Sequence, residues 1–388
     1  MIYLDAAATT KPKQEVIDAM LPYLTEYWEN PSSLYAPSVQ IKRNLDKARG
    51  IIREFINAGE SDDIVFTSGG SEANCAAICG FLTWCRSNGK TPSVITTVIE
   101  HKSIQLCVEK TVDDLHFVGV DEFGFVKQSE LEKILRSIPR QNAVLVSIQY
   151  ANNEIGTIQN IKELAELTHD YGGIFHTDAV QAFGSEPIDV QAEDIDLMSV
   201  SGHKLGAPKG IGFLYKRFGI GIEPLIFGTQ ENGLRGGTEN VPYIVGLAKA
   251  VALRYEDSAY NLRMSILRDD LLTELKAMGC TLNGHPVRRL ANNINVTFHG
   301  ATVTGEALIY LLDAAGIKIS AGSACNSYSV MPSHVLTAIG MSPASAAKTI
   351  RISLPSDFQA DDIEIIIDEF QKAIRLLSMD GEETKAPV

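Results

Sequence analysis

Apolar segments of strand length alternate along this chain with amphipathic helical patterns, and this alternation constrains the fold more than any other feature. The strand-like segments are short and apolar, which is typical of buried strands. They lie at residues 64–67, 93–99, 143–149, 174–176, 196–200 and 212–215. Helical patterns at residues 71–85 and 161–171 stand between them. Repeated strand–helix–strand units predict an α/β protein with a mostly parallel sheet and helices on both faces.

The length of the chain predicts two domains, because 388 residues exceed the size at which a single hydrophobic core stops growing. We expect a large domain at residues 13–255 and a smaller α+β domain formed by residues 1–12 and 256–380. The tail at residues 381–388 is polar and contains a proline, so we expect it to be disordered. Strands of the small domain are expected at residues 293–298 and 349–353.

Charge and hydropathy exclude several classes of protein. The formal net charge of −14 argues against direct nucleic-acid binding, which draws on a basic surface. No apolar run approaches the ~20 residues that cross a bilayer, so we expect no membrane association. The first residues lack the basic and apolar regions of a signal peptide, and we therefore expect a cytoplasmic protein.

The six cysteines show no metal-binding spacing, because no Cys-x-x-Cys pair and no His–Cys cluster occurs. We therefore expect no metal site. Cys75 and Cys79 are four residues apart on an expected buried helix, where cysteine is commonly a small apolar residue. Cys325 differs, because residues 320–332 are small and polar and lack helical or strand periodicity. That composition predicts a flexible loop.

Two short motifs at strand ends indicate a cofactor enzyme when they are taken together. Ser201-Gly-His-Lys204 follows one apolar segment and offers a lysine suited to anchoring pyridoxal phosphate. Asp178 ends the preceding segment, where its carboxylate could face a pyridine nitrogen. Each alone is more often a surface lysine or an ordinary strand end. Ligands of such sheets bind beyond the carboxyl ends of the strands, which is where both residues fall.

A glycine-rich turn at residues 67–74 ends a strand and opens a helix. The unpaired amides and the positive dipole end of that helix suit a phosphate. The turn lacks the G-x-x-x-x-G-K-[ST] of nucleotide hydrolases and the G-x-G-x-x-G of dinucleotide sites. It therefore favours a phosphate that belongs to another kind of ligand.

Motifs spread over nearly the whole chain resemble those of the cysteine desulfurases of the NifS/IscS type. The resemblance rests on the segments at residues 3–10, 30–33, 66–74, 100–103, 152–156, 176–181, 201–204, 233–240 and 322–325. These enzymes have the aspartate aminotransferase-like fold, fold type I, in the class V aminotransferase group. The resemblance implies a large domain with a mostly parallel seven-stranded sheet and a smaller α+β domain. It also implies pyridoxal 5'-phosphate as cofactor and L-cysteine as substrate.

The resemblance assigns roles to residues that match the family motifs. Lys204 would form the Schiff base with the cofactor and later act as general base. Asp178 would pair with the protonated pyridine nitrogen. His101 would stack on the ring, and Gln181 would bond the ring hydroxyl. The phosphate would be held by Gly70, Ser71, Ser201 and His203, and by Thr238 from the partner subunit of a homodimer.

Substrate binding and sulfur transfer fall to three further residues by the same resemblance. Asn153, also near the cofactor, and Arg351 would hold the substrate carboxylate, which matches a guanidinium fork. The Cys325 thiolate would attack the substrate sulfur, leaving alanine and an enzyme persulfide. The sulfur would pass to an acceptor protein, such as an iron–sulfur scaffold, for cluster assembly or thiolation.

Departures from the family pattern leave the geometry of the expected site entrance and the identity of the acceptor open. They are Glu29, residues 35–38, residues 227–229 and Pro355. The sequence leaves three functions open: cysteine desulfurase, a selenocysteine lyase or another class V aminotransferase, and a cofactor-binding scaffold without turnover. Cys325 in the matching loop disfavours an aminotransferase, and Lys204, Asp178 and Cys325 together argue against a scaffold.

Overall fold

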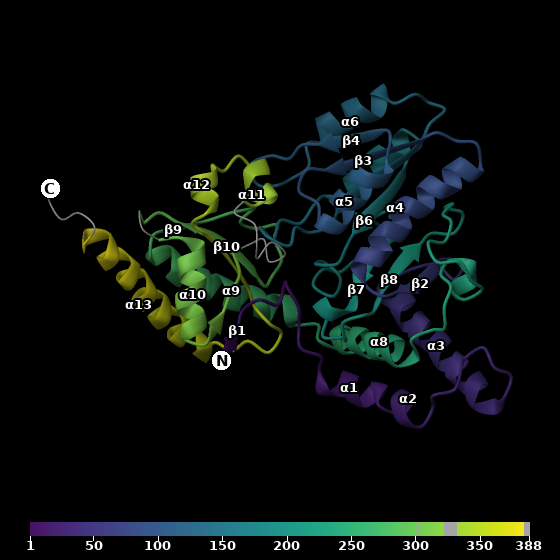
Figure 1. The fold of residues 1–388 in the computed structure, drawn as a ribbon, viewed down its shortest axis with the longest axis horizontal. Coiled ribbons are helices and arrows are strands. Elements are labelled where there is room, and N and C mark those ends of the chain that lie inside the picture. The colour runs from purple at the N-terminus through teal and green to yellow at the C-terminus, as the bar shows by residue number, and fades with distance from the viewer. Residues whose placement is uncertain (301–302, 322–331, 384–388) are drawn as a thin grey trace.

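A computed structural model describes residues 1–300, 303–321 and 332–383 of the chain, with the side chains of residues 379–383 left aside. The predicted loop around Cys325 thus lies largely outside the described residues. Figure 1 shows two lobes, one built around a large sheet and one around a small sheet at which the N-terminal strand lies.

The large lobe contains a seven-stranded sheet in the order β2-β8-β7-β6-β5-β3-β4, as the resemblance implied. Only β8 runs antiparallel to its neighbours in this sheet. The strands are β2 (Asp63–Thr67), β3 (Pro92–Thr97), β4 (Leu115–Val118), β5 (Ala143–Gln149), β6 (Ile174–Asp178), β7 (Leu197–Ser201) and β8 (Gly212–Lys216). The helices of this lobe are α1 (Gln14–Met20), α2 (Pro22–Thr25), α3 (Ala36–Phe55), α4 (Gly70–Ser87), α5 (Lys102–Thr111), α6 (Gln128–Ser137), α7 (Ile161–Asp170) and α8 (Val241–Glu256).

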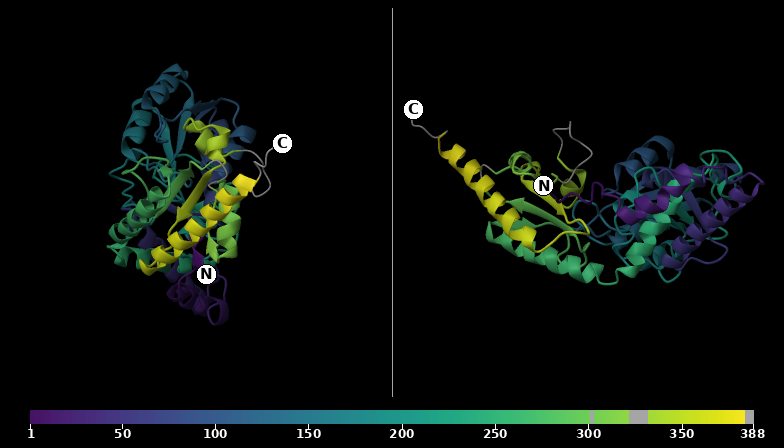
Figure 2. Two further views of the ribbon diagram at one scale, coloured as in Figure 1. Left: turned by 90° about the vertical axis from the view of Figure 1, so that its left-hand side faces the viewer. Right: turned by 90° about the horizontal axis from the view of Figure 1, so that it is seen from below.

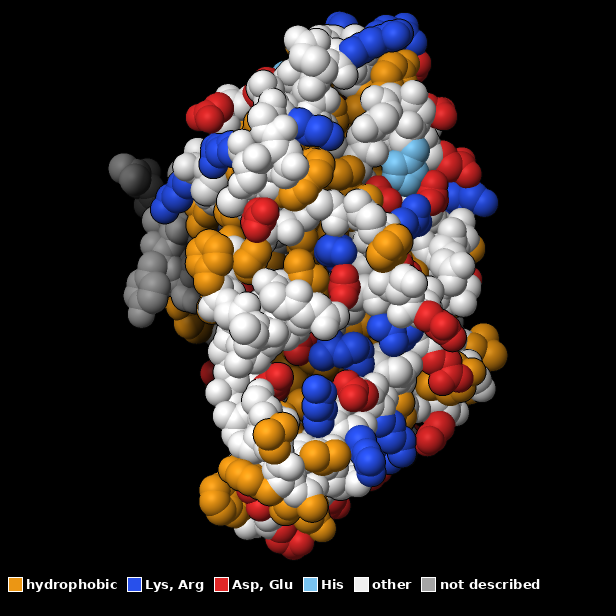
Figure 3. All heavy atoms as spheres, turned by 90° about the vertical axis from the view of Figure 1, so that its right-hand side faces the viewer, with side chains coloured by type: hydrophobic (Ala, Val, Ile, Leu, Met, Phe, Trp, Pro, Cys, Tyr) orange, Lys and Arg blue, Asp and Glu red, His pale blue; other side chains and the backbone are white. Residues whose placement is uncertain are grey.

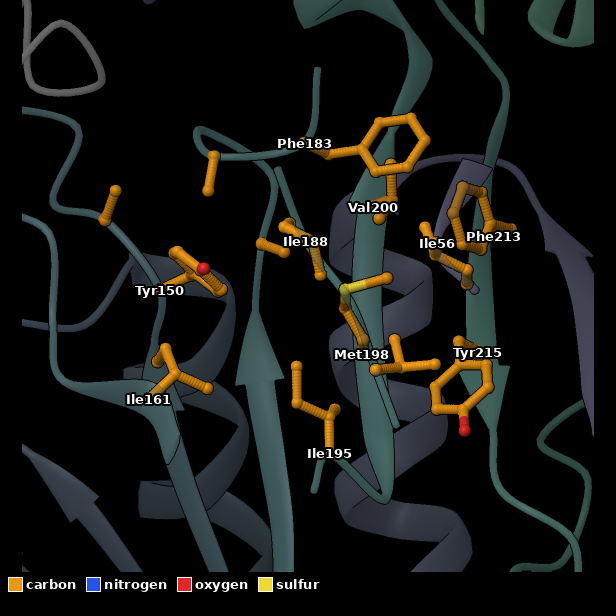
Figure 4. Packing of buried hydrophobic residues seen from close by; sticks show 14 of the residues in the cluster. Ile56, Tyr150, Ile161, Phe183, Ile188, Ile195, Met198, Val200, Phe213 and Tyr215 are labelled. Atoms are coloured by element: carbon orange, nitrogen blue, oxygen red, sulfur yellow. The ribbon is translucent and has the colours of Figure 1, made fainter. Parts of the chain in front are cut away.

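Alternate residues of each strand serve opposite faces of the sheet, because side chains along a strand point to opposite sides. On β8, Phe213 and Tyr215 join the cluster that packs against α3, α6, α7 and α8. Leu214, between them, joins the cluster under α4 and α5. Figure 4 shows Phe213 and Tyr215 packed near Met198 and Val200 of β7. Both faces are thus apolar, which explains the continuous hydrophobic runs in the sequence.

The second lobe has its own apolar cluster, formed around an antiparallel sheet of order β12-β10-β9. Leu4 belongs to this cluster, and β1 (Ile2–Tyr3) pairs with β11 (Ile317–Lys318). The views in Figure 2 show the long helix α13 (Asp361–Glu383) beside the small sheet. The remaining elements are α9 (Tyr260–Ala277), β9 (Cys280–Leu282), β10 (Asn293–Phe298), α10 (Gly305–Ala314), α11 (His334–Ala338), α12 (Pro343–Ala346) and β12 (Thr349–Ser353). The domain division at residues 12 and 255 stays a prediction, because the cluster of the large lobe also contains Leu290, Val335, Leu336 and Ala346 from the expected small domain.

Three expectations from the sequence need correction. We expected a disordered tail from residue 381. Helix α13 instead continues to Glu383, because the helix extends past the last apolar residues of its pattern. Residues 384–388 lie outside the described part. The edge strand β4 was missed, since only Val118 of its four residues is buried and Phe117 is exposed. Cys75 and Cys79 lie on α4 as expected but are partly exposed rather than buried. No helix among the described residues is long and apolar enough to cross a membrane.

Candidate active site

A cavity of about 880 Å³ opens at the carboxyl ends of the central strands, between the two lobes. The last residues of β5, β6 and β7 reach it, as expected for a ligand site of a mostly parallel sheet. Ten residues nominated from the sequence line it: Gly70, Ser71, His101, Asn153, Asp178, Gln181, Ser201, His203, Lys204 and Arg351. Residues far apart in the sequence therefore meet in one place.

Asp178 ends β6 and presents a buried carboxylate to the cavity. Its Oδ2 accepts a hydrogen bond of 2.7 Å from Asn74 Nδ2, and its Oδ1 accepts one of 3.0 Å from the Val180 amide. Hydrogen bonds from N–H donors stabilise a carboxylate in its charged form. This carboxylate is therefore held in a fixed orientation that suits pairing with a protonated ring nitrogen.

Lys204 lies directly after β7, in a short 3-10 turn at Gly202–Lys204. Its Nζ donates to the carbonyl oxygens of Ala7 at 2.5 Å and Ala8 at 2.8 Å. The N-terminal segment thus forms one wall of the cavity. Gln181 Nε2 also donates to the Ala7 carbonyl, at 3.1 Å. The sequence had placed this segment only with the small domain.

His203 is neutral at physiological pH. Burial lowers its pKa to about 4, with a further contribution from the positive charges of Lys204 and Lys209. Its Nδ1 lies 3.2 Å from Thr9 Oγ1. A neutral imidazole can bond a phosphate oxygen through one N–H without adding a buried charge.

The start of α4 forms a close-fitting turn at the cavity. Gly69 has φ of 154°, a conformation that L side chains rarely adopt. A Cβ on Gly70 would lie 2.6 Å from Val180 Cγ2 and 3.3 Å from Ser201 Cβ, so a side chain there would clash. The first-turn amides of this 18-residue helix point outward at its N-terminus. Together with the Ser71 and Ser201 side chains, this turn suits a phosphate.

His101 is the N-cap residue of α5. Its Nδ1 accepts from the Ser103 amide at 3.1 Å and lies 2.8 Å from Ser103 Oγ. Ser103 Oγ also accepts from Asn74 Nδ2 at 3.0 Å. The capping bonds fix the imidazole beside the cavity, so capping and a role at the cavity are compatible.

Arg351 lies on β12 and is almost fully buried. Its Nη2 forms an ion pair of 2.7 Å with Asp5 Oδ1, and its Nη1 donates to the Asn153 carbonyl at 3.0 Å. The sequence did not predict the partnership with Asp5. The ion pair with Asp5 holds the Arg351 guanidinium in place. A substrate carboxylate bound to Arg351 would share that guanidinium with Asp5.

Two buried acids of the cavity were missed in the sequence. Burial raises the pKa of Glu100 to about 8, so this side chain is protonated at neutral pH. Its Oε1 accepts from Thr97 Oγ1 at 2.6 Å and from the Gln149 amide at 3.1 Å. Burial also raises the pKa of Glu154, which accepts from Ser333 Oγ at 2.5 Å. Both acids lie within segments that resemble the family motifs, residues 100–103 and 152–156, but no pattern in the sequence predicted that they are buried.

One nominated residue does not line the cavity of the single chain, and another lies outside the described residues. Thr238 is exposed and does not line it. Cys325 lies outside the described residues, but both flanks of its segment reach the site. Ser320 pairs with Arg351 through backbone bonds, and Ser333 and His334 line the cavity. Among the described residues, no group of three or more His, Cys, Asp or Glu side chains could hold a metal ion.

Comparisons with known proteins agree with this geometry. The family model for aminotransferase class-V matches residues 2–366. The chain is 44% identical over 382 residues to "Cysteine desulfurase IscS" of Methanosarcina thermophila, covering 97% of this chain and 92% of that protein. It is 40% identical over 388 residues to "Cysteine desulfurase IscS 1" of Archaeoglobus fulgidus, covering 98% of each.

Solved structures show the same fold. A NifS-like protein from Rickettsia africae matches with a TM-score of 0.87 at 31% identity, over 97% of this chain and 99% of that one. A structure described as SspA in complex with cysteine matches with a TM-score of 0.79 at 35% identity, over 92% of this chain and 99% of that one. Both similarities span the two lobes and therefore include the cavity.

Proposed function

Because this chain belongs to the class V aminotransferases, and within them to the cysteine desulfurases of the NifS/IscS type, we propose that its cavity binds pyridoxal 5'-phosphate and converts L-cysteine to L-alanine. The sulfur passes to a cysteine of the enzyme and then to an acceptor. The observation that carries this proposal is the meeting of Lys204, Asp178 and His101 in one cavity.

The side chains present fit the cofactor. The Asp178 carboxylate, oriented by Asn74, would hold the proton of a pyridine nitrogen. The α4 N-terminus, with Gly70 and Ser71, offers amides and a hydroxyl to a phosphate. When bound, the cofactor withdraws electrons from the substrate α-carbon and so weakens the bonds at that carbon. Gln181 and Ser201 line the same wall.

The residues of the chain supply binding and proton transfer. Arg351 and Asn153 hold the substrate carboxylate at the edge of the cavity next to β12. The Lys204 amine moves protons between its Nζ and the reacting carbon as general base and acid. His101, fixed by its capping bonds to Ser103, is a second group able to hold a proton. Arg351 is buried and the other three groups are partly buried, which limits their contact with bulk water and strengthens their electrostatic effect.

Cys325 is the proposed nucleophile. Its thiolate attacks the sulfur of the bound cysteine, the carbon–sulfur bond breaks, and the carbon takes up a proton to become alanine. The enzyme keeps the sulfur as a persulfide, so all atoms are accounted for. The flanking residues Ser320 and Ser333 support this proposal, because both are tied to groups at the cavity.

We infer that the functional form is a homodimer in which Thr238 reaches the partner's cavity. Exposed hydrophobic side chains support a second copy, among them Trp28 at 74%, Leu34 at 95% and Phe227 at 81% exposure. Figure 3 shows hydrophobic side chains gathered at the lower end of one face. Light scattering tests this directly: a monomer with full cofactor occupancy would contradict it.

The sulfur acceptor is proposed to be a protein, such as an iron–sulfur scaffold or a component of a thiolation pathway. We also infer a cytoplasmic location, because the described cysteines are free thiols, as is usual in a reducing compartment.

The cofactor proposal is tested with Lys204→Ala. The purified wild-type protein should show a visible absorbance band and form alanine from L-cysteine, and Lys204→Ala should do neither. Lys209→Ala is the matched control, because Lys209 lines the same cavity. A band that persists in Lys204→Ala would place the anchoring amine elsewhere.

A further inference from the structure

Three thiols meet outside the cavity, on the paired helices α4 and α5. Cys75 and Cys79 lie one turn apart on α4, and Cys107 faces them from α5. The sulfur atoms of Cys79 and Cys107 are 3.5 Å apart, close to van der Waals contact. Cys75 and Cys79 are partly exposed, so small reagents in solvent can reach this cluster.

The environment of these thiols makes them unequal. A hydrogen bond from Cys107 lowers the pKa of Cys79 to about 6, and the pKa of Cys107 is raised by its bonds to Cys75 and Cys79. The shared hydrogen bonds thus favour the thiolate form of Cys79 and the protonated form of Cys107. A low-pKa thiol beside a neighbouring thiol is the arrangement of redox-sensitive pairs.

The third cysteine of α4 provides the contrast. Cys85 is fully buried, and burial raises its pKa to about 11, so it is shielded and protonated. The proximity of Cys79 and Cys107 is thus not a general property of cysteines in this lobe. It depends on the packing of α5 against α4, which brings the Cys107 sulfur to the Cys79 sulfur.

We propose that Cys79 and Cys107 form an oxidisable thiol pair that closes to a disulfide in the presence of a peroxide. The Cys79 thiolate attacks one oxygen of hydrogen peroxide, the O–O bond breaks, and hydroxide leaves a sulfenic acid on Cys79. The Cys107 sulfur then attacks the Cys79 sulfur, its proton leaves, and the S–O bond breaks with release of water. Two thiols lose two electrons, and one peroxide is reduced to two waters.

The geometry permits this closure with a small movement. A disulfide needs its sulfurs at about 2.05 Å, so the two atoms approach by roughly 1.5 Å. The pair also joins the two helices that frame the cavity. Asn74 at the start of α4 bonds Ser103 near the start of α5 at 3.0 Å. Oxidation therefore cross-links two elements that carry side chains of the site.

The experiment is peptide mapping of the full-length protein. Fully reduced protein is treated with an equimolar amount of hydrogen peroxide, remaining thiols are alkylated, and non-reduced peptides are identified by mass spectrometry. We expect a linked Cys79–Cys107 peptide that dithiothreitol removes. Before oxidation, brief alkylation should label Cys79 at least tenfold faster than Cys85.

Variants distinguish the proposed order of steps. Cys107→Ser should leave Cys79 as a sulfenic acid that dimedone traps, whereas Cys85→Ser should form the disulfide like the wild type. The proposal would be overturned if Cys79 and Cys107 stayed reduced while other thiols of the protein were oxidised. A linkage of Cys107 to Cys75 in place of Cys79 would overturn it equally. None of these readouts depends on cofactor content or on desulfurase activity.

Discussion

Asn74→Ala tests how the site orients the carboxylate of Asp178. Asn74 is fully buried, and its Nδ2 donates to Asp178 Oδ2 at 2.7 Å. Its Oδ1 accepts no hydrogen bond from the described residues. The side-chain amide of Asn74 is thus oriented by the hydrogen bonds that its Nδ2 donates. The substitution removes that donor from a buried carboxylate, whose Oδ1 still accepts from the Val180 amide.

The expected loss follows from the charged acceptor. A hydrogen bond to a charged group contributes about 1.5–3 kcal/mol. If that energy is realised when the cofactor binds, the dissociation constant for pyridoxal phosphate rises roughly 10- to 150-fold. We would measure it by equilibrium dialysis of the apoprotein, with absorbance as a second readout. Thermal unfolding of the apoprotein records any separate loss of stability.

The matched control lies at the other end of the same helix. Asn88 follows α4, and its Nδ2 donates to the Trp84 carbonyl at 2.9 Å. Asn88→Ala should therefore change cofactor affinity by less than about twofold, since it touches no residue of the cavity. The reasoning is refuted if Asn74→Ala binds the cofactor like wild type while Asp178→Asn binds it weakly. Asp178 would then act without the help of Asn74.

Three further outcomes follow from the same structure. Asp178→Asn should keep the fold and lower kcat by about 100-fold or more, because a neutral amide cannot hold the ring proton; steady-state kinetics checks this. Gly70→Ala should lower thermal stability and cofactor affinity because of the 2.6 Å contact with Val180, whereas Gly50→Ala, with nothing within 4 Å, should be neutral or slightly stabilising. His176 is fully buried, and burial lowers its pKa to about 3, so the unfolded chain binds its proton between pH 6.5 and 3 while the native protein does not. Stability should then fall with falling pH across that window by up to ~1.4 kcal/mol per pH unit, and denaturant titrations should show a shallower fall for His176→Gln.

Many residues of the candidate site could be predicted because they stand in short contiguous motifs at the ends of strands. Lys204 and Asp178 each follow an apolar strand, and strand ends of a mostly parallel sheet meet at one edge. The glycines of the turn before α4 indicated the phosphate site that we propose there. In these cases local sequence determines where the residue lies. The family resemblance then supplied the roles.

Other features depend on contacts between distant segments, which sequence patterns do not encode. The carbonyls of Ala7 and Ala8 reach Lys204 only because β1 joins the second lobe. The Arg351–Asp5 ion pair joins residues 346 positions apart. Helical spacing alone predicted buried Cys75 and Cys79, but the packing of α5 leaves both partly exposed. Tertiary packing decided each of these outcomes.

The most direct test of the proposed function is mass spectrometry of the protein after brief exposure to L-cysteine, with alkylation to trap persulfides. The peptide that contains Cys325 should gain the mass of one sulfur atom in proportion to the alanine released. Cys325→Ser should retain the cofactor yet form neither persulfide nor alanine, because a serine hydroxyl is a poor nucleophile toward sulfur. Alanine formation by Cys325→Ser, or a persulfide confined to another cysteine, would contradict the account.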